Sequence, residues 1–69
     1  MKLSTRNQLA GTVVEITTGE AMAVVKVKLN GGDILTSSIT KDAVDDLGLE
    51  VGSSVVALVK STEVALGVE

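Results

Sequence analysis

The sequence contains no cysteine, no histidine and no phenylalanine, tyrosine or tryptophan among its 69 residues. Without cysteine the chain has neither disulfide bonds nor thiolate metal ligands. Without histidine it lacks the commonest metal ligand and the usual general base, so an enzyme is the least favoured class of protein. The acidic run from Asp42 to Glu50 fits a solvated helix face better than a calcium loop, and we expect no direct ligands for a metal cation.

Basic residues are also scarce. Six lysines and arginines stand against nine aspartates and glutamates, which gives a formal net charge of −3. A nucleic-acid surface needs a basic stripe and usually aromatic stacking platforms, so neither DNA nor RNA is an expected partner. The chain also has no long apolar run and no apolar signal segment at its N-terminus. We therefore expect a cytoplasmic protein without membrane association.

The residues that are present include 45% hydrophobic ones, all of them aliphatic, alanine or methionine. A core of this kind packs well between strands. We expect a single domain over residues 1–69, and a domain this short buries only about 60% of the surface that its unfolded chain exposes. Because covalent staples are absent, burial between subunits is the expected source of additional stability.

Turn signals divide the first part of the chain into three predicted strands. The first covers residues 8–16 and ends before a glycine-containing turn. The second covers residues 21–29 and alternates cleanly toward its end. The sequence Asn-Gly-Gly-Asp at residues 30–33 predicts a hairpin, so the third strand, residues 34–40, should pair antiparallel with the second.

A short helix and two more strands are predicted in the second part. Thr40 is the expected N-cap and Gly48 the expected C-terminal stop of a helix of about two turns. Residues 53–60 are apolar on both faces, which is typical of a central or an interface strand. Residues 63–69 alternate and predict a fifth strand. The pattern favours a mainly-β fold: a small five-stranded barrel of the oligonucleotide/oligosaccharide-binding (OB) type, with one short helix between strands three and four.

Two polar segments at strand ends each place one cation among hydroxyl groups. The first is Lys-Leu-Ser-Thr-Arg-Asn-Gln-Leu at residues 2–9, and the second is Val-Lys-Ser-Thr at residues 59–62. Together with the hydroxyls of residues 36–38 they offer the donors that an oxyanion requires. Each segment alone also fits a structural interpretation, a surface ion pair of Arg6 or a turn whose hydroxyls bond their own backbone.

Both segments resemble the signatures of the molbindins, small proteins made of one Mop domain. The chain has Ser-Thr-Arg-Asn-Gln-Leu where the family has a Ser-Ala-Arg-Asn-Gln type string, so Thr5 departs from the usual alanine, and Lys-Ser-Thr closes its late Val-rich strand. The resemblance extends over essentially the whole chain. By this resemblance the oxyanion-binding residues are expected to be Ser4, Arg6, Asn7, Lys60 and Ser61, with Ser37 and Ser38 as weaker candidates.

The resemblance implies a binding protein without a cofactor that holds molybdate, and often tungstate, at subunit interfaces of a homohexamer assembled from three dimers. A chain with no further domain would serve storage or buffering of molybdenum. The residues themselves leave two other classes open. The same donors suit another oxyanion such as sulfate or phosphate, and an oligomeric barrel with a purely structural role could use these hydroxyls as caps.

Overall fold

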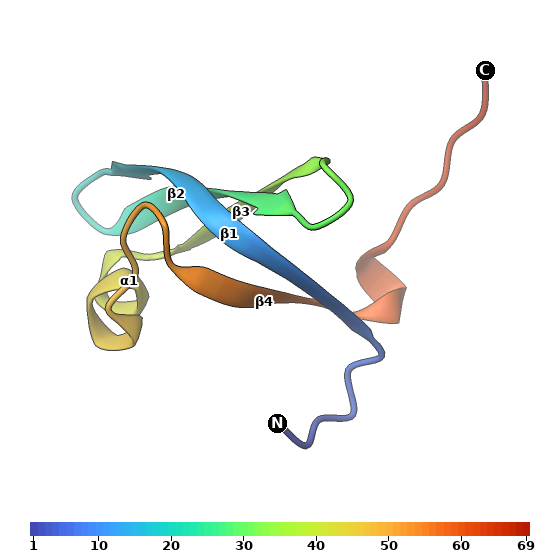
Figure 1. The fold of residues 1–69 in the computed structure, drawn as a ribbon, viewed down its shortest axis with the longest axis horizontal. Helices are drawn as coiled ribbons and strands as arrows, with labels where there is room; N and C mark the ends of the chain where they lie inside the picture. The colour runs from blue at the N-terminus through green and yellow to red at the C-terminus, as the bar shows by residue number, and fades with distance from the viewer.

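The computed structural model describes all 69 residues and shows one curled antiparallel sheet (Figure 1). The strand order is β3-β2-β1-β4, and the helix α1 lies between the third and fourth strands of the chain. The mainly-β class and the position of the helix are thus confirmed. The elements are β1 (Asn7–Thr18), β2 (Met22–Leu29), β3 (Ile34–Thr40), α1 (Lys41–Leu47), β4 (Ser54–Val59) and the 3₁₀ helix η1 (Ser61–Glu63).

The sheet curls along the long strand β1, because β1 pairs with different strands at its two ends. Its residues 7–12 pair with β4, and its residues 11–18 pair with β2. A β-bulge leaves Val14 without a register partner, and bulges bend a strand and increase its twist. At Gly11 a Cβ atom would lie 2.6 Å from the carbonyl oxygen of Lys28, so only glycine allows the two strands to approach this closely.

The turns and helix ends follow their sequence signals. In the β2–β3 hairpin the amide of Gly32, at a φ of 104°, donates to the carbonyl oxygen of Leu29 at 2.8 Å. The hydroxyl oxygen of Thr40 accepts a hydrogen bond from the amide of Ala43 at 3.1 Å and caps α1. The helix ends at Gly48, which adopts a left-handed conformation with a φ of 63°. The hairpin and both helix caps are therefore confirmed.

The core is small for a chain of this size. Its buried side chains come from one face of β1 and β2 and from α1. They are Val13, Ala23, Val25, Val27 and Val44. The chain exposes 5373 Å², whereas a compact monomer of its 7.0 kDa exposes about 4,000 Å². The radius of gyration is 12.7 Å, against about 11 Å expected for this length. The single chain therefore leaves much apolar surface uncovered.

The predicted fifth strand is absent from the chain, which has four strands and not five. Residues 64–69 follow η1 and run away from the sheet (Figure 1). Leu66 is 94% exposed and Val68 is fully exposed. The alternation that predicted a strand is real, but the segment pairs with no strand of its own chain.

The strand at residues 53–60 forms as β4, but it lies at an edge of the sheet, so a central position is wrong. Apolar side chains of β4, such as Leu58 at 45% exposure, remain open to solvent. The alternative of an interface strand stays a prediction. No helix of the structure is both long and apolar enough to cross a bilayer.

Candidate functional site

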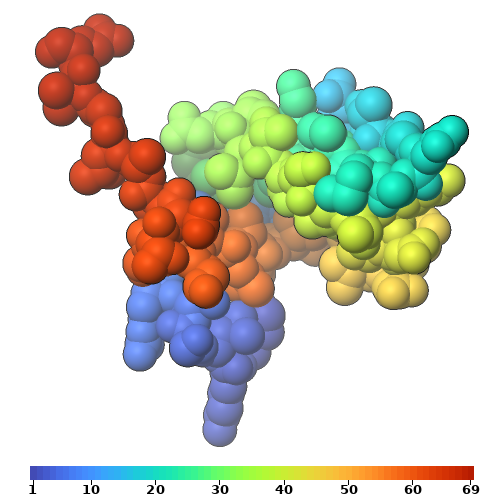
Figure 2. Space-filling model, turned by 180° about the vertical axis from the view of Figure 1, so that it is seen from behind, coloured from blue at the N-terminus to red at the C-terminus, as the bar shows by residue number.

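The pairing of β1 with β4 brings the two polar segments together. Asn7 and Val59 are register partners, and the side-chain amide of Asn7 donates a hydrogen bond to the carbonyl oxygen of Val59 at 3.0 Å. The segment that precedes β1 and the segment that follows β4 therefore lie side by side. Figure 2 shows this junction, where the blue N-terminal residues touch the orange residues that follow β4.

A polar pocket of about 220 Å³ lies at this junction. None of its lining residues is hydrophobic and none is acidic. They provide two cationic groups and four hydroxyl groups, all able to donate hydrogen bonds. The lining residues are Ser4, Thr5, Arg6, Lys60, Ser61 and Thr62. A concave surface that carries positive charge and converging donors suits a small anion.

Local hydrogen bonds shape both segments of the pocket. On the N-terminal side, the side-chain amide of Gln8 donates to the carbonyl oxygen of Thr5 at 2.8 Å. On the other side, the amide of Glu63 donates to the carbonyl oxygen of Lys60 at 2.9 Å and closes the 3₁₀ turn η1. These bonds fix the backbone that carries the hydroxyls and the two cations.

The structure brings together four of the seven residues expected at the site, Ser4, Arg6, Lys60 and Ser61. Asn7 lies beside the pocket, where its amide is bonded to a backbone carbonyl. Ser37 and Ser38 belong to β3, which β2 separates from β1, and neither lines this pocket. The ligand role of all seven residues stays a prediction.

Thr5 and Thr62 also line the pocket, although the sequence-based reasoning did not select them. The sequence does contain a signal for both, because each threonine stands directly beside an expected site residue in an unbroken polar segment. Backbone geometry decides which members of such a string face a ligand, and the string alone does not give that geometry.

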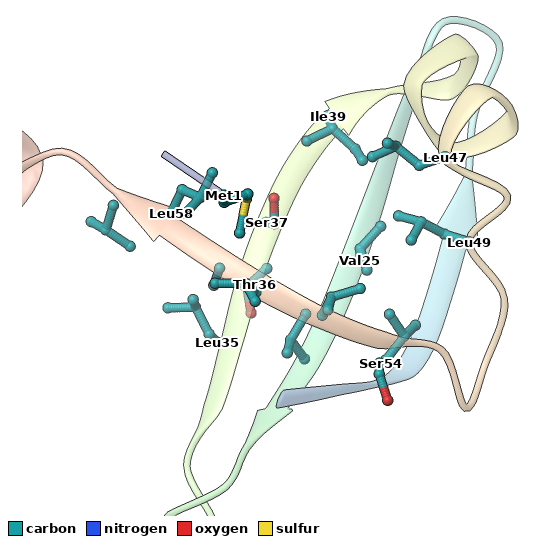
Figure 3. Close-up of a pocket in the computed structure, with 16 residues that line it drawn as sticks. Met1, Val25, Leu35, Thr36, Ser37, Ile39, Leu47, Leu49, Ser54 and Leu58 are labelled. Carbon is teal, nitrogen blue, oxygen red and sulfur yellow. The ribbon is translucent and has the colours of Figure 1, made fainter. Parts of the chain in front are cut away.

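A second cavity, of about 750 Å³, is apolar and lies along the inner side of the sheet (Figure 3). Thirteen of its sixteen lining residues are hydrophobic. Leu35 and Ile39 of β3 line one side, and Val55 and Leu58 of β4 line the other. Ser37 also lines this groove. With so few polar groups it does not suit an anion.

The curled sheet with a polar pocket at one end defines a small β-domain built for binding. The TOBE domain family matches residues 3–66, so the chain belongs to this family, and over its full length it is a single Mop domain of the molbindin type. The family consists of binding domains, and the chain is therefore a binding protein and not an enzyme.

Two of the relatives match along their whole length. A probable molybdenum-pterin-binding protein of Haemophilus influenzae is 46% identical over 69 residues, which is 100% of both chains. MopII from Clostridium pasteurianum has a TM-score of 0.92 at 40% identity and covers 97% of this chain and 100% of its own. The cytoplasmic molybdate-binding protein ModG, with molybdate bound, has a TM-score of 0.95 at 48% identity, and the match spans 100% of this chain and 49% of ModG.

Proposed function

We propose that this chain binds molybdate, and tungstate as a second ligand, in the polar pocket between the two strand ends. The observation that carries the proposal is the junction itself. Register pairing of β1 with β4 places Arg6 and Lys60, far apart in the sequence, at one pocket with four hydroxyl groups and no carboxylate. The names of the relatives, including a ModG with molybdate bound, support the same ligand.

The chemistry of the ligand fits this lining. Molybdate at neutral pH is a tetrahedral dianion, so it needs a compensating charge and several donors directed at its four oxygens. Arg6 and Lys60 supply charge and charged donors, and the hydroxyls of Ser4 and Ser61 supply directional donors. A hydrogen bond to a charged group contributes about 1.5–3 kcal/mol, so a few such contacts would supply substantial affinity for the ion.

The dimensions of the pocket favour the bare oxyanion over a pterin conjugate. Several relatives are named molybdenum-pterin-binding proteins. Sites for organic small molecules are usually about 300–1,000 Å³ and mostly apolar. The pocket here has about 220 Å³ and no hydrophobic lining residue. A tetrahedral anion fits both properties.

We place the site at a subunit interface of a homohexamer formed by three dimers. Ser4, Arg6, Lys60 and Ser61 are all exposed in the single chain, so an ion bound there would remain partly in water. A second subunit laid over the pocket would remove that water and strengthen every charged contact. The large uncovered apolar surface of the single chain supports the same assembly.

The proposed cellular role is storage or buffering of molybdenum in the cytoplasm. The Haemophilus influenzae relative matches end to end and thus consists of this domain alone. A protein of that kind would serve to take up the oxyanion and to release it again. ModG, described as cytoplasmic, supports the location.

Isothermal titration of the anion-free protein with molybdate tests the proposal, with the mass of the oligomer measured in the same buffer. We expect tight binding that a large excess of sulfate or phosphate does not displace. Equal competition by either ion would establish a general oxyanion site. Absence of any heat change on a folded oligomer would favour the purely structural barrel and overturn the proposal.

A further inference from the structure

Residues 1–6, here called the N-terminal arm, carry half of the polar pocket but are held by a single hydrogen bond. The arm precedes β1 and belongs to no helix or strand (Figure 1). It supplies Ser4, Thr5 and Arg6 to the pocket. The bond runs from the side-chain amide of Gln8 to the carbonyl oxygen of Thr5 at 2.8 Å. No other hydrogen bond and no ion pair of the structure involves the arm.

The other half of the pocket is held by different contacts. Its residues, Lys60, Ser61 and Thr62, follow β4 directly, and the last two lie in η1. The amide of Glu63 closes this turn on the carbonyl oxygen of Lys60 at 2.9 Å. Loss of the bond from Gln8 therefore leaves this half of the pocket as it is and releases only the arm.

The bond from Gln8 sets the orientation of the peptide unit between Thr5 and Arg6. A trans peptide is planar, so its C=O and N–H groups point in opposite directions. While Gln8 holds the carbonyl oxygen of Thr5, that acceptor is occupied and the amide N–H of Arg6 points away from Gln8. A released peptide unit could turn its carbonyl oxygen toward the pocket, where it would repel an anion. The orientation of this unit thus affects the charge that the arm presents.

We propose that Gln8 is a positioning residue of the oxyanion site, a role that rests on the proposed function. Its side-chain amide holds the arm so that Ser4, Thr5 and Arg6 face the ligand. Gln8 itself does not line the pocket and makes no contact with the ion. Its task differs from that of Asn7, which bonds across to β4, whereas Gln8 bonds back along its own segment.

Loss of this amide should weaken molybdate binding and leave the urea midpoint of the fold unchanged. Gln8→Ala should raise the Kd from titration calorimetry about threefold to tenfold, the net effect of one neutral hydrogen bond. Gln8→Asn keeps the amide on a side chain one methylene shorter, so it should lose as much. Ser53→Ala is the matched control. The hydroxyl of Ser53 accepts a bond from the amide of Glu50 that is also exposed and also spans three residues, but it lies outside the pocket.

Double-mutant cycles separate positioning from a general structural effect. If Gln8 acts through the arm, its removal matters most while the arm still carries Arg6. In an Arg6→Ala background, Gln8→Ala should cost no more than about twofold in Kd, whereas in a Lys60→Ala background it should keep its full effect. Equal costs in the two backgrounds would overturn the proposal. If the wild type binds no molybdate, the proposed function fails; if it binds and the Gln8 variants bind equally well, this inference alone fails.

Limited proteolysis measures the order of the arm without any anion. Trypsin cleaves after arginine and lysine, and a cut after Arg6 requires the arm to open locally. Gln8→Ala should speed this cut several-fold, while the cuts after Lys26 and Lys28 within β2 keep the wild-type rate. Ser53→Ala should be cleaved like the wild type at all three sites. An unchanged rate of cleavage after Arg6 in Gln8→Ala would mean that the bond does not order the arm, and it would overturn the proposal.

Discussion

The side-chain amide of Asn7 donates to the backbone carbonyl of Val59 at 3.0 Å, across 52 residues of sequence. This bond joins the outermost register pair of β1 and β4. Residues 4–6 and 60–62, which line the polar pocket, lie immediately next to that pair. Asn7 therefore orders the two segments relative to each other. We expect Asn7 to influence ligand binding through this contact, without lining the pocket itself.

Asn7→Ala should lower both the stability and the affinity for molybdate. A hydrogen bond of this kind contributes about 1 kcal/mol, and Asn7→Asp should cost more because its carboxylate faces a carbonyl oxygen and repels the anion. Urea denaturation and titration calorimetry measure the two effects. Thr17→Ala, at an exposed position near the other end of β1, is the control and should change neither quantity.

Arg6→Ala and Lys60→Ala should each weaken molybdate binding about tenfold to a hundredfold, because each removes a charged donor from the pocket. The fold should persist, since both side chains are exposed. Calorimetry at fixed ionic strength gives the affinities. Lys28→Ala removes the same charge from β2 outside the pocket. If this control weakened binding equally, the effect would be one of net charge and not of the site.

Molybdate should raise the melting temperature of the protein. Ligand that binds only the folded assembly stabilises it by about 2.7 kcal/mol at a free concentration of 100 Kd. Differential scanning calorimetry over a molybdate series should show a steady upward shift, and the Arg6→Ala variant should require higher concentrations for the same shift. An identical shift with sulfate would argue against selectivity for molybdate.

Gly11→Ala should destabilise the fold by about 1–3 kcal/mol, the usual cost of overpacking. Its Cβ atom would lie 2.6 Å from the carbonyl oxygen of Lys28 and 2.7 Å from a methyl carbon of Val27, so β1 and β2 must move apart. Gly31→Ala is the matched control, because nothing lies within 4 Å of a Cβ atom at that turn position. Chemical denaturation of both variants decides whether close strand approach matters.

Elements with local signals were predictable from the sequence. The turn at residues 30–33, the Thr40 cap and the Gly48 stop each depend on a few neighbouring residues, and all three occur as expected. Apolar and polar residues alternate toward the end of β2, which predicts a strand with one buried face. Val25 and Val27 on that face do lie in the core. In each case the physical cause lies within one element or one turn, which a sequence displays directly.

Features that depend on distant parts of the chain were less accessible. Residue types showed which segments could bind an anion, but the register of β1 with β4 decides that residues 4–6 meet residues 60–62. The alternation in residues 64–69 predicted a fifth strand, but a strand forms only against an available sheet edge, and the segment's own sequence does not show one. Whether β4 lies at an edge or in the centre likewise depends on how all the strands of the sheet pair.

The bulge at Val14 divides β1 into two lengths with separate alternation. Before the bulge, residues 7–12 pair with β4, whereas β2 pairs with β1 on both sides of it. The bulge already accommodates one extra residue in β1 that has no counterpart in β2. The register that holds the two polar segments together runs over residues 7–12, entirely before the bulge, so the change of twist at Val14 falls beyond it.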